Sequence, residues 1–272
     1  MSIVTRAYTL YQEKGFLAFF KAFLKYFVDF PGVWRRLRLS YYRRRGRCIV
    51  SVGNIRITMQ VTDDDDAVEL LYARTTERYL IKEIINELKP GDTFWDIGAN
   101  LGIYSLIAAG VPGVNVIAFE PNPNTAKKLK NNITLNHKTS IRVLQTALAD
   151  TETTVKFATM ENRGHGKAHI AFDDDSNTIE VKTDSGDKLT ATGAVPRPDI
   201  VKIDVEGAEC LVLKGMQSIL SGCRVIFCEV HPNIQRYGHS PAELESILKS
   251  TGFSLMKIQQ RDNTYHLKAS KI

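Results

Sequence analysis

Apolar and polar segments alternate along most of the chain from residue 93 onward. Short apolar runs, which are typical of buried strands, are separated by stretches with apolar residues at helical spacing. The runs predict strands at 93–97, 115–120, 141–146, 199–204 and 224–230. The stretches between them predict helices at 102–109, 123–136, 208–220 and 241–251. This alternation predicts an α/β fold, in which helices cover both faces of a mostly parallel sheet.

Other segments precede or interrupt this alternation. Residues 48–61 alternate around Gly53 and Asn54, which predicts a β-hairpin. Residues 67–88 have the periodicity of one helix, which Pro90 and Gly91 end. Further strands are expected at 155–158 and 178–182, on either side of a polar loop at 162–167. That loop could cover an active site, or it could be a simple exposed connection.

One glycine-rich turn carries the candidate cofactor chemistry. Residues 96–102 read Asp-Ile-Gly-Ala-Asn-Leu-Gly and lie between a predicted strand and a predicted helix. Glycines here let the backbone approach a ligand, and the helix start offers free N–H groups. The spacing is not the G-x-G-x-x-G of dinucleotide sites, and the Asp96 carboxylate would repel a pyrophosphate. The turn therefore favours S-adenosylmethionine (SAM), which has no phosphate and carries a sulfonium and an ammonium.

The next predicted strand supports a nucleoside ligand. It ends in Glu120, about 20 residues after Gly98, where a carboxylate accepts hydrogen bonds from ribose hydroxyls. At the end of the third strand, we expect backbone groups of Ala147 and Leu148 to contact the adenine. The candidate cofactor-binding residues are Asp96, Gly98, Asn100, Gly102, Glu120, Pro121, Ala147, Leu148 and Asp204.

These segments resemble the FkbM family of SAM-dependent methyltransferases. The resemblance rests on residues 94–102, on residues 119–123 and on the run 201–209 (VKIDVEGAE), which is the most specific. It implies a Rossmann-like class I methyltransferase fold, whose seven-stranded sheet is closed by an antiparallel hairpin at 254–259 and 264–269. It also implies an O-methyltransferase that acts on a hydroxyl of a sugar, of a glycan (free or lipid-linked) or of a related natural product.

Polar residues follow two of the predicted core strands and form the candidate catalytic group. Asp204 and Glu206 follow strand 199–204, and Glu229 and His231 end strand 224–230. Ligands of open α/β sheets lie at this edge, so we expect these side chains to converge. His231 is the first candidate for the general base because its ordinary pKa is near neutrality. Asp204 and Glu206 are the second candidates. Alternatively, His231 has only the structural role of ending a strand, and Asp204 and Glu206 only stabilise the N-terminus of the next helix.

A divalent metal is an alternative use of the same residues. Asp204, Glu206, Glu229 and His231 offer the oxygen and nitrogen ligands that suit Mg²⁺ or Mn²⁺. A bound ion would lower the pKa of a coordinated hydroxyl and replace the base. The spacing does not require an ion, so the sequence favours a metal-free site.

Positive charge is concentrated in the N-terminal part of the chain. Residues 1–47 contain eleven Lys and Arg and two acids, a net charge of +9, whereas the whole chain carries +6. Residues 15–30 are rich in phenylalanine, with charges on one helical stripe, and are too short to span a bilayer. We expect a basic amphipathic helical extension at 1–47, bound to an anionic membrane surface or packed on protein, and a methyltransferase domain at 48–272. That net acidic domain argues against nucleic acid as a partner.

The remaining features bear on compartment and on rival functions. The four cysteines have no C-x-x-C spacing and indicate buried reduced thiols. With no convincing signal peptide, we expect a cytoplasmic protein, with the extension on the inner face of the membrane. A lipid head group or an amide is the alternative acceptor. A non-catalytic SAM-fold partner in a membrane glycan-assembly complex is the alternative from another class, and the intact acids and glycines argue against it.

Overall fold

The computed structural model describes residues 31–159, 168–261 and 263–272. The aromatic segment 15–30 and the polar loop 162–167 therefore lie outside the described residues. The chain divides into two compact units. One comprises the described residues within Met1–Cys48 together with Val61–Leu71, and the other comprises Ile49–Gln60 and Tyr72–Ile272.

The first unit contains α2 (Pro31–Arg45) and most of α3 (Asp64–Thr75). The Arg43 guanidinium donates to both carboxylate oxygens of Asp64 at 3.0 Å, and this pair links the two helices.

Strands β1 (Arg47–Val52) and β2 (Ile55–Gln60) form the predicted hairpin, most of which belongs to the second unit. Gly53 takes φ +55 in its turn, a conformation that glycine adopts at low cost.

A seven-stranded sheet forms the centre of the second unit. Its order is β12-β13-β11-β10-β3-β4-β5. Its strands are β3 (Thr93–Ile97), β4 (Asn115–Phe119), β5 (Ile141–Leu144), β10 (Ile200–Ile203), β11 (Val225–Val230), β12 (Phe253–Arg261) and β13 (Thr264–Lys271). The pairs from β11 to β5 are parallel, and β13 runs antiparallel to both of its neighbours. The predicted strands and closing hairpin are confirmed, and the fold is the class I methyltransferase fold.

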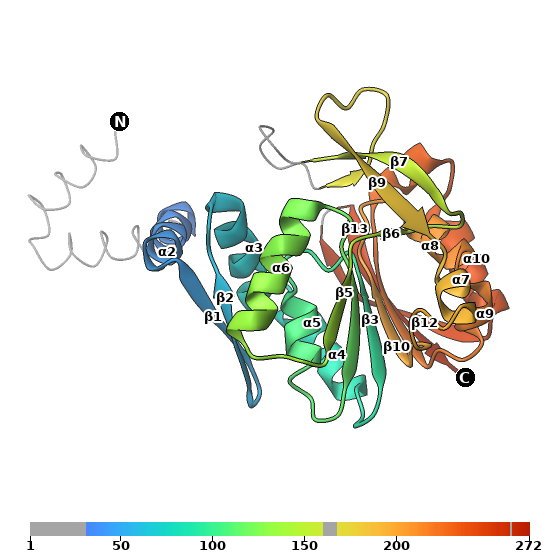
Figure 1. Ribbon diagram of the computed structural model, residues 1–272, viewed down its shortest axis with the longest axis horizontal. Coiled ribbons are helices and arrows are strands. Elements are labelled where there is room, and N and C mark those ends of the chain that lie inside the picture. Colours follow the sequence, from blue (N-terminus) through green and yellow to red (C-terminus); the bar gives the residue numbers. More distant parts are fainter. Residues whose placement is uncertain (1–30, 160–167, 262) are drawn as a thin grey trace, which may run out of the picture. The chain divides into compact units, whose positions relative to one another are not determined.

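Helices cover both faces of this sheet, as predicted (Figure 1). One face carries α4 (Arg78–Glu87), α5 (Ile103–Ala108) and α6 (Pro123–Leu135). The other carries α7 (Gly186–Ala191), α8 (Glu209–Lys214), α9 (Gln217–Leu220) and α10 (Pro241–Ser250). Because the sheet is covered on both sides, β3, β10 and β11 are buried at every position.

Two predicted helices are each broken in two. The stretch 67–88 forms α3 and α4, which separate at Thr76 and Glu77. Two adjacent threonines are poor helix formers, and the Thr75 hydroxyl donates to the backbone of its own last turn. The stretch 208–220 forms α8 and α9 around Gly215. A Cβ at Gly215 would lie 1.9 Å from the Ala149 carbonyl oxygen, so close packing against a distant loop sets this break.

The chain segment between β5 and β10 forms a second sheet. Its order is β6-β9-β7-β8. Its strands are β6 (Ala147–Leu148), β7 (Thr153–Ala158), β8 (His169–Ile170) and β9 (Thr178–Asp184). The strands expected at 155–158 and 178–182 are confirmed. The expected third core strand is shorter than predicted, because β5 ends at Leu144. Ala147 and Leu148 then pair with β9 and do not continue β5.

The four cysteines are free and buried, as expected from their spacing. Within the described ranges, no helix combines the length and the hydrophobicity needed to cross a bilayer.

Candidate active site

The ends of β3 and β10 meet at the centre of the large sheet, where the chain order changes direction. From β3 the chain continues to β4 on one side, whereas β10 pairs on the other side. Ligands of doubly wound sheets bind outside the strand ends at such a point. The Asp204 amide donates to the Ile97 carbonyl at 3.0 Å, so the two strand ends lie against each other.

Gly98 makes this close approach possible. Its φ is +76, and a Cβ there would lie 1.9 Å from the backbone oxygen of Asp204. The glycine of the predicted turn is therefore required by the packing of two strand ends. Gly102, at φ +86, precedes α5, and Asn100 also has a positive φ of +49.

Asp96 is fully buried and its charge is paired within the protein. Its Oδ2 accepts a 2.6 Å hydrogen bond from the Ser105 hydroxyl. Its Oδ1 lies 3.5 Å from the Lys202 ammonium. Because Asp96 is fully buried, its carboxylate is not open to direct contact with a ligand.

Lys202 is a site residue that the sequence analysis missed. Its ammonium lies 3.3 Å from the Asp204 carboxylate, donates to the Gly98 carbonyl at 3.1 Å and sits over the Tyr104 ring. Burial lowers its pKa, but the carboxylates of Asp204 and Asp96 outweigh burial and raise the pKa above the ordinary value for lysine. The available signal was one charged residue within an otherwise apolar strand.

Glu120 lies at the end of β4, as predicted, and is 6% exposed. One of its carboxylate oxygens accepts from the backbone N–H of Asn100 and the other from the backbone N–H of Asn122, both at 2.9 Å. Burial raises the pKa of Glu120 to about 7, although these two hydrogen bonds oppose the shift. Each oxygen can accept a second hydrogen bond.

Three other predicted cofactor residues, Pro121, Ala147 and Leu148, lie on two segments. Pro121 is buried beside Glu120, and the Asn122 side chain caps the start of α6. Ala147 and Leu148 are buried in β6 of the second sheet and are not at the end of the third core strand, where the adenine contact was expected. The Thr146 hydroxyl donates to the Lys182 carbonyl at 3.0 Å, so this segment has already turned toward the second sheet.

The predicted catalytic residues converge around His231, which is 5% exposed. Its Nε2 lies 3.3 Å from Glu206, 3.5 Å from Glu229 and 3.8 Å from Asp204. Its Nδ1 lies 2.7 Å from Glu209, which is fully buried and was not assigned a role from the sequence. On the far side of Glu229, His266 Nε2 lies 3.4 Å from the second carboxylate oxygen.

The carboxylates determine the protonation of His231. Burial alone would lower its pKa, but Glu206 and Glu209 outweigh burial and raise the pKa to about 11. In the absence of another cation, the ring is therefore protonated at neutral pH. A protonated imidazole holds carboxylates together, but it cannot accept the proton of a substrate.

A strained turn orients Glu206 toward this histidine. Glu206 has φ +56, in the left-handed region, which is uncommon for residues other than glycine, and Gly207 follows at φ +115. The Gly207 amide donates to Glu209 at 2.9 Å. A Cβ at Gly207 would lie 2.9 Å from the Tyr237 ring, whose hydroxyl donates to Ile170 of β8. The second sheet therefore reaches the edge of the acidic group.

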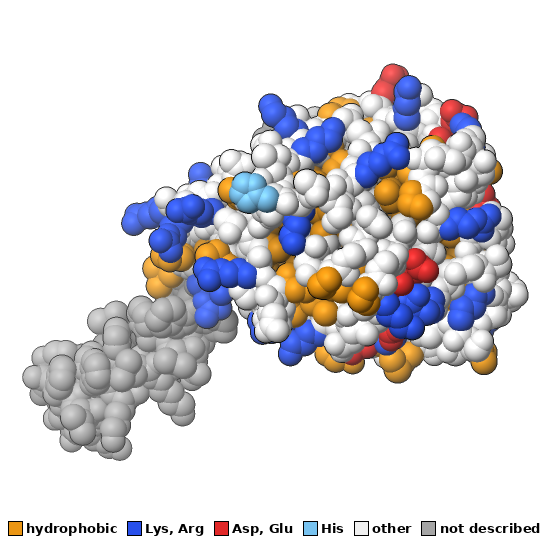
Figure 2. Space-filling model, turned by 60° about the horizontal axis from the view of Figure 1, so that its bottom comes forward, with side chains coloured by type: hydrophobic (Ala, Val, Ile, Leu, Met, Phe, Trp, Pro, Cys, Tyr) orange, Lys and Arg blue, Asp and Glu red, His pale blue; other side chains and the backbone are white. Residues whose placement is uncertain are grey.

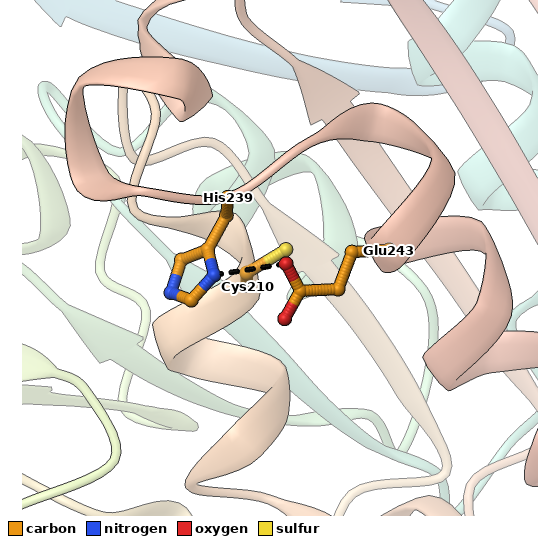
Figure 3. A group of neighbouring side chains, drawn as sticks. All are labelled: Cys210, His239 and Glu243. Atoms are coloured by element: carbon orange, nitrogen blue, oxygen red, sulfur yellow. Dashed lines mark hydrogen bonds and ion pairs between the residues drawn. The ribbon is translucent and has the colours of Figure 1, made fainter.

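Two groups among the described residues have metal-ligand chemistry. One is Asp204, Glu206 and His231, whose ligand atoms lie within 4.8 Å of one another. The other is Cys210, His239 and Glu243, where the imidazole faces the carboxylate (Figure 3). In the second group, one Glu243 oxygen is 3.0 Å from His239 Nδ1 and the other is 3.0 Å from the Lys214 ammonium.

Comparison with known proteins agrees with the fold and the motifs. A family model for the methyltransferase FkbM domain matches residues 96–255, more than half of the chain. The hexuronic acid methyltransferase AglP of Haloferax volcanii is 33% identical over 158 residues, which cover 58% of this chain and 64% of that protein. The chain thus spans slightly less than two thirds of the length of this relative.

Two further relatives extend the comparison. The 31-O-demethyl-FK506 methyltransferase FkbM of Streptomyces tacrolimicus is 30% identical over 206 residues, 64% of this chain and 76% of that protein. The SAM-bound structure of magnesium protoporphyrin IX methyltransferase (ChlM) from Synechocystis PCC 6803 has 14% identity and a TM-score of 0.46. It aligns with 93% of this chain and 97% of its own, and this likeness is too low to bear on function.

Proposed function

The chain belongs to the methyltransferase FkbM domain family, and on this premise we propose that it transfers a methyl group from SAM to a hydroxyl of a sugar or glycan. One observation carries the proposal. Three carboxylates and His231 meet at the strand ends beside the Gly98 turn, where a nucleoside cofactor and its acceptor would lie together.

The residues around the turn fit SAM. Glu120 has free acceptor capacity on both oxygens and would take the ribose hydroxyls. Asp204 is the more exposed carboxylate at the turn and would face a cationic group of the cofactor, whereas buried Asp96 adds to the negative potential from behind. When bound, SAM supplies a methyl group that its sulfonium has already activated.

Activation of the acceptor falls to the acidic group. With SAM bound, the acceptor oxygen would bond to the methyl carbon as the sulfur–methyl bond breaks, the sulfur would keep the electron pair, and the hydroxyl proton would go to a carboxylate. Because both ring nitrogens of His231 face carboxylates, we assign the proton-accepting role to Asp204 or Glu206 and not to His231. His231 would hold these acids in place, and Glu229 would complete the ring of acids around it.

A sugar acceptor is supported by the relatives and by the edge of the site. Two relatives are named as methyltransferases of a hexuronic acid and of the demethylated FK506 oxygen. Next to the Glu206 turn, the half-buried rings of Phe172 and Tyr237 lie 4.7 Å apart. Aromatic side chains commonly line pockets for small molecules.

The direct test is incubation of the full chain with labelled SAM and fractionated glycans, both soluble and lipid-linked. We expect label in a glycan fraction as a base-stable methyl ether. Label confined to base-labile methyl esters or to protein would contradict O-methylation of a hydroxyl. Calorimetry that detects NADH binding but no SAM binding would contradict the cofactor assignment.

We also propose that the basic extension binds an anionic membrane surface. Helix α2 contains six arginines and no acidic residue. Leu37 and Tyr41, one turn apart, are 51% and 53% exposed, and Arg45 donates to the Tyr41 hydroxyl. Apolar and aromatic side chains flanked by arginines suit the lipid interface. Figure 2 shows basic side chains spread over the described residues.

A further inference from the structure

The acidic group around His231 has a feature that an organic acceptor alone does not explain. The side chain of His231 is 5% exposed, and its Nε2 has no hydrogen-bond partner among the described residues. This atom nevertheless points between three carboxylates at 3.3–3.8 Å. These contacts are ion pairs without hydrogen-bond geometry, and a buried polar atom without a hydrogen bond is costly, which favours a cation between the nitrogen and the acids.

We propose that Asp204, Glu206 and His231, with Glu229 beside them, bind one divalent cation of the Mn²⁺ or Mg²⁺ class. One ligand atom from each of the first three residues lies within 4.8 Å of the other two. These atoms are close enough that small side-chain shifts would let a single ion bind all three at about 2.0–2.2 Å. Carboxylate oxygens with one imidazole nitrogen are a ligand set that suits Mn²⁺.

The surroundings of His231 already have the arrangement of a metal ligand. Its Nδ1–H donates to the fully buried Glu209 at 2.7 Å, which directs Nε2 toward the acids. Metal-bound histidines almost always donate their other ring N–H to a carboxylate or carbonyl in this way. Glu209 also accepts the Gly207 amide, so its own position is fixed. The strained left-handed backbone of Glu206 brings the third ligand to the same point.

The group in Figure 3 is an internal comparison that lacks these features. Both carboxylate oxygens of Glu243 are engaged, one by His239 and one by the Lys214 ammonium. Lys214 also lies 3.5 Å from His239 Nδ1. A cation of the protein therefore already occupies the place that an ion would take, and we expect no metal there.

The cation would make the acceptor hydroxyl more acidic than the carboxylates alone can. This role, though not the binding itself, rests on the proposed function. A bound divalent ion lowers the pKa of a coordinated hydroxyl, so the acceptor oxygen loses its proton more readily. With the cation bound, Nε2 of His231, Asp204 and Glu206 would all be its ligands, so the hydroxyl proton would leave to Glu229 or to water and not to the two liganding acids.

The test is titration of the chelator-treated full chain with Mn²⁺, with free Mn²⁺ followed by electron paramagnetic resonance. We expect one Mn²⁺ per chain. Glu206→Gln, which removes a ligand, should weaken binding at least tenfold. Glu209→Gln, which removes only the partner of the histidine, should weaken it about 10–100-fold. The matched controls Glu243→Gln and His239→Ala alter the second group and should leave Mn²⁺ affinity unchanged.

S-adenosylhomocysteine affinity, measured by calorimetry for each variant, shows that the variant is folded. No Mn²⁺ bound at millimolar concentration, or unchanged affinity in Glu206→Gln, would overturn the proposal. Methyl transfer at full rate in excess EDTA would overturn the role of the cation and leave the proposed function standing. Mn²⁺ binding without any binding of S-adenosylhomocysteine would support the metal site and contradict the proposed function.

Discussion

At the scale of single residues, Glu120 combines deep burial with spare acceptor capacity. Since burial raises its pKa to about 7, a large share of the side chain is protonated below neutrality. Ribose hydroxyls donate to the ionised carboxylate, so cofactor binding favours the ionised form and releases a proton. Affinity should therefore be lost as the pH falls through about 7 and be fully present above it.

We expect the affinity for S-adenosylhomocysteine to fall about tenfold between pH 8 and pH 6, the factor by which the ionised fraction falls. Calorimetry in two buffers with different ionisation enthalpies would measure both the affinity and the proton release. Glu120→Gln should bind more weakly at pH 8 and lose most of this pH dependence. An equal pH dependence in that variant would assign it to another group.

Asp204 is expected to affect the transition state more than the bound cofactor. Asp204→Asn removes a negative charge that lies between the cofactor turn and the acidic group, and the Lys202 ammonium then loses a carboxylate partner at 3.3 Å. We expect turnover to fall by roughly 10²–10⁴, the usual contribution of a proton-accepting group, with a much smaller change in cofactor affinity. Single-turnover kinetics with saturating SAM would separate the two effects, and wild-type turnover would exclude the role. His231→Ala should behave similarly, because the ring holds the same acids.

At the scale of elements, the contact between the ends of β3 and β10 depends on one glycine. Gly98→Ala places a Cβ 1.9 Å from the Asp204 oxygen at a positive φ, so the strand ends must separate. We expect a loss of stability of at least about 1–3 kcal/mol and weakened cofactor binding. Gly53→Ala is the matched control, because its φ is also positive but nothing lies within 4 Å of its Cβ. A smaller fall in Tm for Gly98→Ala than for this control would contradict the packing argument.

The elements that the sequence predicted well are those with a strong local pattern. The core strands are continuous apolar runs bounded by glycine, proline or acids, and buried parallel strands have this pattern. The second sheet was not predicted as a sheet, because β6 and β8 have two residues each and show no periodicity. The break at Gly215 depends on its approach to Ala149, which no local pattern reports.

The candidate site, like the fold, has some features that the sequence predicts and others that depend on contacts between distant residues. Strand-end position was sufficient to bring Asp204, Glu206, Glu229 and His231 together, since parallel strands end at one edge. The pairing of Asp96 with Lys202 depends on the register between β3 and β10, which the sequence does not contain. The protonation of His231 depends on how closely four carboxylates pack around it, and this also appears only in three dimensions.

At the scale of the whole molecule, the arginines of α2 lead to a test of membrane attachment. Replacing Arg36, Arg38 and Arg44 by Gln in the full chain removes three exposed charges. Each basic residue contributes about 1 kcal/mol near an anionic surface, so partition should weaken roughly 100-fold. Flotation with vesicles of anionic and of neutral lipids would measure this. The control variant replaces the exposed Lys127, Lys130 and Lys156 by Gln. Equal flotation of both variants would favour a helix that packs on protein.

The pairing of Lys202 with the Gly98 turn also has a consequence for how the protein is made. The two residues are 104 positions apart, so β3 leaves the ribosome long before its partner β10. Until then, β3 has an open edge, and Asp96 lacks the cation that accompanies it in the folded protein. A chain that stops before residue 200 would keep one open edge on an apolar strand, next to an acid that lacks its cation. Products that terminate before β10 should therefore aggregate or be degraded, because the cofactor turn lacks the strand end and the lysine against which it packs.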